Sequence, residues 1–131
     1  MNQRVKSRIF FFALLLLLAS PSFGNSRILE LQGAITDSQC AFNVHSNNGS
    51  HDDMIKTRSG GSSPKECTLR CAKGMGGSYV LAVQDHIYRL DNQAQAEKFA
   101  GETVKITGTL VDAKTNTLHI RSIEVVAGIK Q

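Results

Sequence analysis

Three cysteines are the residues of this 131-residue chain best suited to do chemistry, and two histidines lie close by in the sequence. Cys67 and Cys71 are four residues apart, a spacing that places both side chains on one face of a helix. Three thiolates and one imidazole make a closed tetrahedral zinc shell. Copper(I) is a second candidate ion, because soft thiolates suit it. The candidate metal ligands are therefore Cys40, Cys67, Cys71 and one histidine, His45 or His51.

A disulfide is the favoured interpretation of the same cysteines. Oxidising compartments favour disulfides, and a bridge from Cys40 to either Cys67 or Cys71 would close a loop of about 27 to 31 residues, worth roughly 3 to 4 kcal/mol in the chain-entropy model. A bridge between Cys67 and Cys71 is disfavoured, because their Cβ vectors run nearly parallel on a helix. The cysteine left over would be a spare thiol. With Lys65 and Arg70 nearby it would have a lowered pKa, which gives a third interpretation, a redox-active thiol.

The first 24 residues have the pattern of a signal peptide. A basic stretch with Arg4, Lys6 and Arg8 precedes the apolar run 9–18, and small residues flank a cleavage site before Asn25. We therefore expect residues 1–24 to be removed and residues 25–131 to be a single domain, periplasmic or secreted by a bacterium. An uncleaved anchor helix is the alternative; after cleavage no stable membrane anchor would remain.

Cleavage also changes the charge of the chain. Three of the 15 basic residues lie in 1–24 and none of the 11 acidic ones does, so the net charge falls from +4 to +1. A nearly neutral domain without tryptophan has little long-range attraction for phosphates, and few aromatic platforms on which bases could stack. A small ligand or an envelope protein is therefore a better expected partner than nucleic acid.

The hydrophobic pattern predicts five strands. Period-two alternation marks 29–35 and 104–110, short β-prone runs mark 79–83 and 87–90 joined through residues 84–86, and the last strand, 118–125, needs a β-bulge near Arg121 and Ser122 where its phase slips. Residues 36–77 are expected to form a long polar loop followed by a cysteine-bearing helix over 64–73, with Ser63 and Glu66 as a capping box. A second helix is expected over 92–100, capped by Asp91.

This order of elements is typical of an OB-fold. A small, mainly β, five-stranded OB-fold-like barrel would have one helix between strands three and four, and the cysteine-bearing helix would lie in an insertion after strand one. Gly33 and Gly108, inside strands, suit the sharp coiling of a small closed barrel. An open α+β sheet is the alternative, because it permits the same order.

The sequence constrains the function of the domain less than its fold. OB-folds bind ligands on the face of strands two and three, where Tyr79, Tyr88 and Arg89 are candidate ligand contacts. No hydrolase, zincin, phosphate-loop or dinucleotide motif is present, and His86 and His119 are expected to face solvent. The sequence therefore indicates a non-enzymatic binding module of unknown ligand; the alternative is a metal-binding (zinc or copper) or thiol-redox protein of the cell envelope.

Several glycine and cysteine landmarks extend over nearly the whole of 25–131. They are Gly33-x-Ile35-x-Asp37-Ser38-x-Cys40, Cys67-x-x-x-Cys71, Gly77-x-Tyr79-Val80-Leu81 and Gly101-x-x-Val104-x-Ile106-x-Gly108-Thr109-Leu110. This pattern resembles a group of uncharacterised exported bacterial proteins. The resemblance implies an exported, OB-like domain of unknown function and assigns no catalytic residue.

Overall fold

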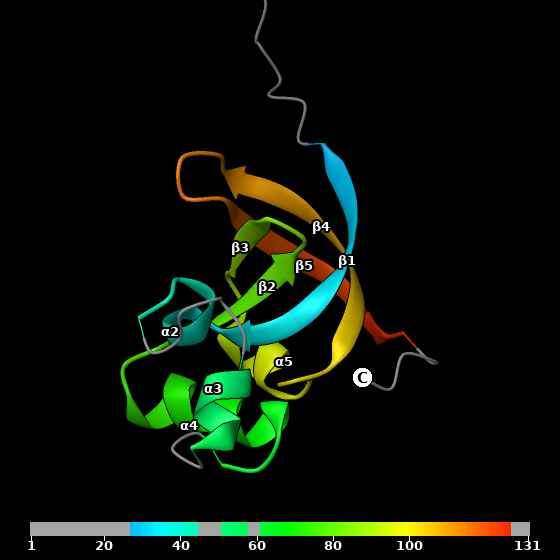
Figure 1. Ribbon diagram of the computed structural model, residues 1–131. Helices are drawn as coiled ribbons and strands as arrows, with labels where there is room; N and C mark the ends of the chain where they lie inside the picture. The colour runs from blue at the N-terminus through cyan, green and yellow to red at the C-terminus, as the bar shows by residue number, and fades with distance from the viewer. Residues whose placement is uncertain (1–26, 45–50, 58–60, 127–131) are drawn as a thin grey trace, which may run out of the picture.

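Five strands and four helices make up the computed structural model, which describes residues 27–44, 51–57 and 61–126 (Figure 1). The predicted signal peptide, residues 1–24, lies outside the described residues. Within the described ranges, no helix is both long enough and apolar enough to cross a membrane. The strands are β1 (Ile28–Asp37), β2 (Tyr79–Val83), β3 (His86–Leu90), β4 (Thr103–Asp112) and β5 (Thr117–Val125), and the helices are α2 (Ser38–Ala41), α3 (Asp52–Lys56), α4 (Pro64–Gly74) and α5 (Gln93–Glu97).

The strands form one mixed sheet that closes in a ring, in the order β1-β2-β3-β5-β4 and back to β1. The long strand β1 makes the closure possible, because its residues 28–34 pair with β4 while its residues 34–37 pair with β2. All pairs are antiparallel except β3 with β5, which join in parallel over two residue pairs. The mainly β prediction with five strands is therefore confirmed.

Two glycines let the ring curve tightly. A Cβ atom added to Gly33 would lie 2.1 Å from the carbonyl oxygen of Ala82, and one added to Gly108 would lie 2.5 Å from that of His119. No side chain fits at such distances from the backbone. Gly108 also adjoins the predicted bulge: Thr107 pairs with Ser122 but Gly108 pairs with Ile120, so Arg121 is the extra residue.

The interior of the ring is mostly aliphatic. Its buried residues come from all five strands, from α5 and from the turn that follows α5. They are Ile35, Tyr79, Leu81, Leu90, Ala96, Ala100, Val104, Ile106, Leu118 and Ile120. A second, smaller buried cluster lies outside this core and consists of Cys40, Cys67 and Cys71, with Met54 packed against it. The fold thus separates the three cysteines from the main core.

Three local predictions need correction. Residues 36–63 were expected to be one loop, but α2 and α3 form within them; each is five residues or fewer, too short to show a helical hydrophobic period. The hairpin turn has two residues instead of three, because Gln84 adopts a φ of 48° and Val83 pairs directly with His86. Asn92, and not Asp91, caps α5, accepting the Gln95 N–H at 3.0 Å.

Candidate metal centre

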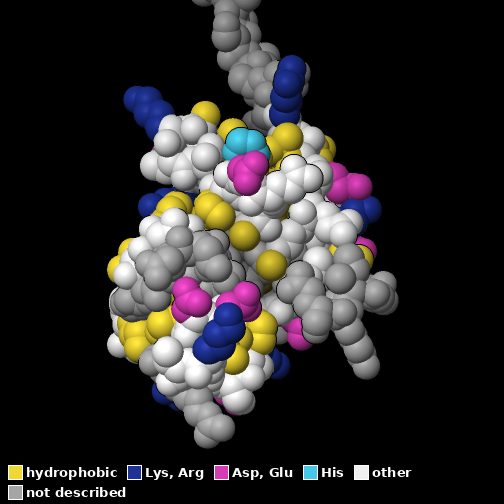
Figure 2. Space-filling model, viewed as in Figure 1, with side chains coloured by type: hydrophobic (Ala, Val, Ile, Leu, Met, Phe, Trp, Pro, Cys, Tyr) yellow, Lys and Arg dark blue, Asp and Glu magenta, His cyan; other side chains and the backbone are white. Residues whose placement is uncertain are grey.

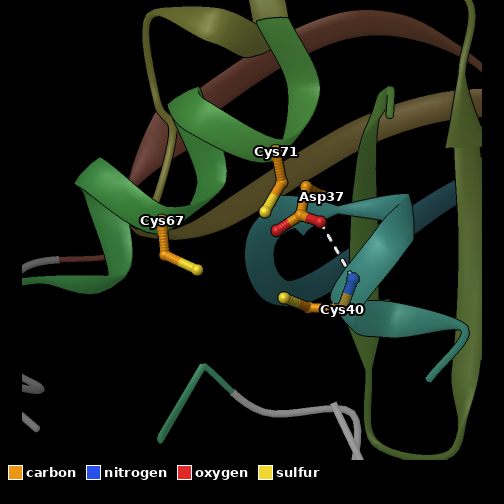
Figure 3. A group of neighbouring side chains, drawn as sticks. All are labelled: Asp37, Cys40, Cys67 and Cys71. Atoms are coloured by element: carbon orange, nitrogen blue, oxygen red, sulfur yellow. Dashed lines mark hydrogen bonds between the residues drawn. The ribbon is translucent and has the colours of Figure 1, made fainter. Parts of the chain in front are cut away.

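One carboxylate and three thiols converge at the junction of β1, α2 and α4. Ligand atoms of Asp37, Cys40, Cys67 and Cys71 all lie within 4.8 Å of one another, and all four side chains are buried. Figure 3 shows the three sulfur atoms and the carboxylate of Asp37 directed toward a common point, with Cys40 approaching from α2 and Cys67 and Cys71 from α4. Segments that are 30 residues apart in sequence therefore build one site.

Asp37 is the donor that the sequence interpretation missed. It is the last residue of β1 and the N-cap of α2, where its Oδ1 accepts the Cys40 N–H at 2.9 Å. The other oxygen, Oδ2, is buried and has no hydrogen-bond partner among the described residues. A buried carboxylate oxygen without a partner is costly, and here it faces three thiols. The spacing Asp-x-x-Cys after a strand was the available signal, since an aspartate at that place caps a helix.

Helix α2 is only four residues long and is held by its neighbours. The Ser38 N–H donates to the Ser78 carbonyl at 2.8 Å, and the Ser78 N–H donates to Ser38 Oγ at 3.0 Å. This reciprocal pair ties the start of α2 to the start of β2. Cys40 is thereby fixed relative to the sheet although its helix has a single turn.

Helix α4 begins as the sequence predicts and presents Cys67 and Cys71 on its buried face. Ser63 is the N-cap and accepts the Glu66 N–H at 3.2 Å. The predicted capping box is modified: the Glu66 carboxylate accepts the backbone N–H and the hydroxyl of Ser62, at 2.7 and 3.0 Å. These hydrogen bonds hold the pKa of Glu66 below its usual value. The helix carrying two of the thiols is therefore capped at its start.

His51 borders the site without being one of its four converging donors. Its Nε2 lies 2.8 Å from the Thr36 hydroxyl and 3.4 Å from the Thr68 hydroxyl, and its Nδ1 lies 3.8 Å from Asp37 Oδ2. Nδ1 is buried and has no hydrogen-bond partner among the described residues. Burial lowers the pKa of His51, against the opposing effects of Asp37 and Asp52. A neutral imidazole therefore adjoins the carboxylate.

Burial also controls the protonation of the thiols. It raises the pKa of Cys71 to about 12, with the Asp37 charge as the next cause, and raises the pKa values of Cys40 and Cys67 as well. The lowered pKa expected for a spare thiol near Lys65 and Arg70 is therefore wrong, because loss of water outweighs those side chains. Without a metal ion the thiols are protonated at neutral pH, so a coordinating ion would have to displace their protons.

The disulfide predicted from Cys40 to Cys67 or Cys71 is not formed in this structure, where all three cysteines are free. The three sulfur atoms instead share their surroundings with a carboxylate, so no pair of them stands apart as a bridge. His45, the predicted fourth metal ligand, lies outside the described residues. Among the described residues, the donor that joins the three cysteines is Asp37.

The three residues predicted for a ligand face do not share one surface. Tyr79 is only 5% exposed and packs in the main core, and Tyr88 is half-buried against that core. Arg89 is exposed, with its guanidinium 5.4 Å from the ring centre of Phe42. Because successive side chains of a strand point to opposite faces, Tyr88 and Arg89 of β3 lie on opposite faces of the sheet.

Within the part of the chain that the structure describes, the remaining histidines and charged side chains do not gather into a second site. His119 is exposed as expected, but its Nδ1 lies 2.5 Å from Asp91 Oδ2, which gives Asp91 a role other than the predicted helix cap. Figure 2 shows lysine and arginine side chains scattered over the face in view, with acidic side chains among them. On that face the positive charges do not form a continuous patch of the kind that binds a phosphate backbone.

Comparisons with known proteins return no relatives: no family model, curated protein or solved structure matches the chain.

Proposed function

We propose that this domain binds one zinc ion through Asp37, Cys40, Cys67 and Cys71, and that the ion links the end of β1 and helix α2 to helix α4. The observation that carries the proposal is the convergence within 4.8 Å of donor atoms from three cysteines and Asp37, whose buried Oδ2 has no hydrogen-bond partner among the residues that the structure describes. A bound cation would satisfy that oxygen.

Zinc suits this donor set better than the other common ions. Structural zinc sites are four-coordinate, with thiolate, imidazole or carboxylate ligands, whereas calcium and magnesium take oxygen ligands. Three thiolates and one carboxylate together carry four negative charges, and a divalent ion offsets more of that charge than copper(I) does. Complete burial of all four side chains favours a closed structural site, because catalytic zinc sites keep a position open.

A purely structural cluster of thiols is the competing interpretation. Unpaired cysteine behaves as a small hydrophobic residue and is among the most buried types. Three such residues would pack well beside Met54 without any ion. That interpretation leaves the buried oxygen of Asp37 unexplained, because an apolar cluster gives a carboxylate no compensation for lost water.

The wider proposal is an exported OB-like domain whose zinc site braces the segment inserted after β1. The strand order β1-β2-β3-β5-β4, the parallel contact of β3 with β5 and the helix between β3 and β4 support the OB-like assignment. Export to the periplasm or beyond rests on residues 1–24. A small ligand or an envelope protein remains the proposed partner class, and the domain has no proposed catalytic residue.

Metal content tests the proposal directly. The protein would be purified without oxygen, loaded with zinc and analysed by native and denaturing mass spectrometry, beside Cys71→Ser and Thr109→Ser. Thr109 is buried outside the site, so its variant controls for general disturbance of the fold. We expect one zinc ion retained by the wild type and by Thr109→Ser, and lost by Cys71→Ser. A zinc-free protein whose mass is lower by two hydrogens would contradict the proposal and indicate a disulfide.

A further inference from the structure

The sulfur-containing side chains of the described residues gather at one place. Among the described residues the sulfur-containing side chains are Cys40, Cys67, Cys71, Met54 and Met75. The cysteines form the second buried cluster, Met54 packs against it, and the Cys71 thiol donates to the thioether sulfur of Met75 over 3.9 Å. Two thioethers therefore border the proposed zinc site. The protein ligands of zinc are thiolate, imidazole and carboxylate, whereas copper(I) is suited by thioethers as well as by thiolates.

Met75 occupies a different position from Met54. It is the C-cap of α4 and is 40% exposed, yet its sulfur contacts a thiol that is fully buried. Flexible methionines commonly fill gaps in a core, but a residue this exposed fills no core gap. Met75 is thus a soft donor that touches both solvent and the buried thiol of Cys71.

The backbone of Met75 is held on two sides. Its N–H donates to the Cys71 carbonyl at 3.3 Å, and its own carbonyl accepts from the Gln39 side-chain amide at 3.1 Å. The Gly77 N–H also donates to the Cys71 carbonyl, and a Cβ atom on Gly77 would lie 2.8 Å from that oxygen. The chain after α4 therefore folds back closely, which keeps the thioether over Cys71.

We infer that the same site also binds copper(I) and that Met75 is the residue at which this ion first binds on its way to the cysteines. This inference rests on the proposed metal site. When a chelator delivers copper(I) to the protein, the bonds between the ion and the chelator break and copper–sulfur bonds form. Each thiol that coordinates loses one proton to the buffer, and copper stays in the +1 state. Where zinc is already bound it leaves as Zn²⁺, taken up by a chelator.

The test measures transfer rates without oxygen. Copper(I) held by a chromophoric chelator is mixed with the metal-free full-length protein, and loss of the chelator complex is followed by stopped-flow absorbance for wild type, Met75→Leu and Met54→Leu. Leucine keeps the apolar volume of methionine and removes the sulfur. We expect transfer to Met75→Leu to be slower by about tenfold, as for loss of an outer-shell partner, and transfer to Met54→Leu to match the wild type.

Zinc affinity serves as the second readout, because Met75 is not one of the four proposed zinc donors. It should be the same for wild type and Met75→Leu, which also shows that the variant is folded. Equal copper(I) rates for wild type and Met75→Leu, or equal slowing by both leucine variants, would overturn the role of Met75 while leaving the zinc site standing. If the wild type binds neither zinc nor copper(I), both proposals are overturned.

Discussion

Replacing Asp37 with asparagine should affect the metal-free and zinc-bound proteins in opposite directions. In the metal-free protein, asparagine retains an oxygen for the Cys40 N–H and therefore keeps the cap of α2. The substitution replaces the buried carboxylate, whose Oδ2 has no hydrogen-bond partner among the described residues, by an uncharged amide, and loss of water costs an amide less than a carboxylate. The difference is worth roughly 1 to 3 kcal/mol. For a domain of about 100 residues, 1 kcal/mol corresponds to about 4 to 8 °C in the melting temperature, so Asp37→Asn should melt several degrees higher without metal.

With zinc the same substitution removes one of four ligands. Loss of an outer-shell partner already lowers metal affinity by about 10- to 100-fold, and a direct ligand should cost at least the upper end of that range. About 100-fold in affinity is about 2.7 kcal/mol. Zinc should therefore stabilise the variant less than the wild type by about this amount when the ion is present well above its dissociation constant.

The assay is thermal unfolding with and without zinc, monitored by circular dichroism, with Asp91→Asn as the matched control. Asp91 also accepts a backbone N–H, that of Ile120 at 3.2 Å, and also lies beside a histidine, but no cysteine surrounds it. The control should leave the zinc-dependent rise in melting temperature unchanged. A variant Asp37→Asn that is destabilised without metal, or that keeps the full zinc-dependent rise, would refute the role given to Asp37.

Four further predictions follow from the structure. Because burial raises the pKa of Cys71 to about 12, zinc binding should release about one proton per coordinating thiol. Calorimetry in buffers of different ionisation enthalpy measures the number of protons released. A value of zero would count against thiolate ligation. The folded chain holds these protons more tightly than the unfolded chain does, so the metal-free protein should lose stability as the pH rises above the ordinary thiol value of 9.0, and the zinc-bound protein should not. Gly33→Ala should destabilise the fold by roughly 1 to 3 kcal/mol in chemical denaturation, because its Cβ would lie 2.1 Å from a carbonyl oxygen; Gly74→Ala, with no atom within 4 Å of the added Cβ, should not. His51→Ala should weaken zinc by about 10-fold through loss of the imidazole that borders Asp37, and an unchanged affinity in chelator competition would exclude that role.

Strands and the cysteine-bearing helix were predictable because their signals are local. Period-two alternation marked β1 and β4, and Ser63 with Pro64 marked the start of α4. Even the bulge at Arg121 was visible as a slip in the hydrophobic phase. Such features depend on side chains a few residues apart, which a sequence shows directly.

Other features depend on contacts between distant segments. Helix α2 is a single turn held by Ser78, 40 residues away from Ser38, and no local period could reveal it. The sequence pattern places Asp37 in the loop after the first strand and gives it no role as a ligand, because its partnership with Cys67 and Cys71 exists only after α4 packs against β1. Tyr79 was assigned to a ligand face, although closure of the sheet buries it in the core.

X-ray absorption at the zinc edge of the loaded, oxygen-free protein identifies the ligands of the ion itself. We expect three sulfur neighbours at about 2.3 Å and one oxygen neighbour at about 2.0 to 2.2 Å, with the oxygen contribution altered in Asp37→Asn. A first shell of nitrogen and oxygen without sulfur, or a spectrum that is the same for wild type and Asp37→Asn, would contradict this expectation.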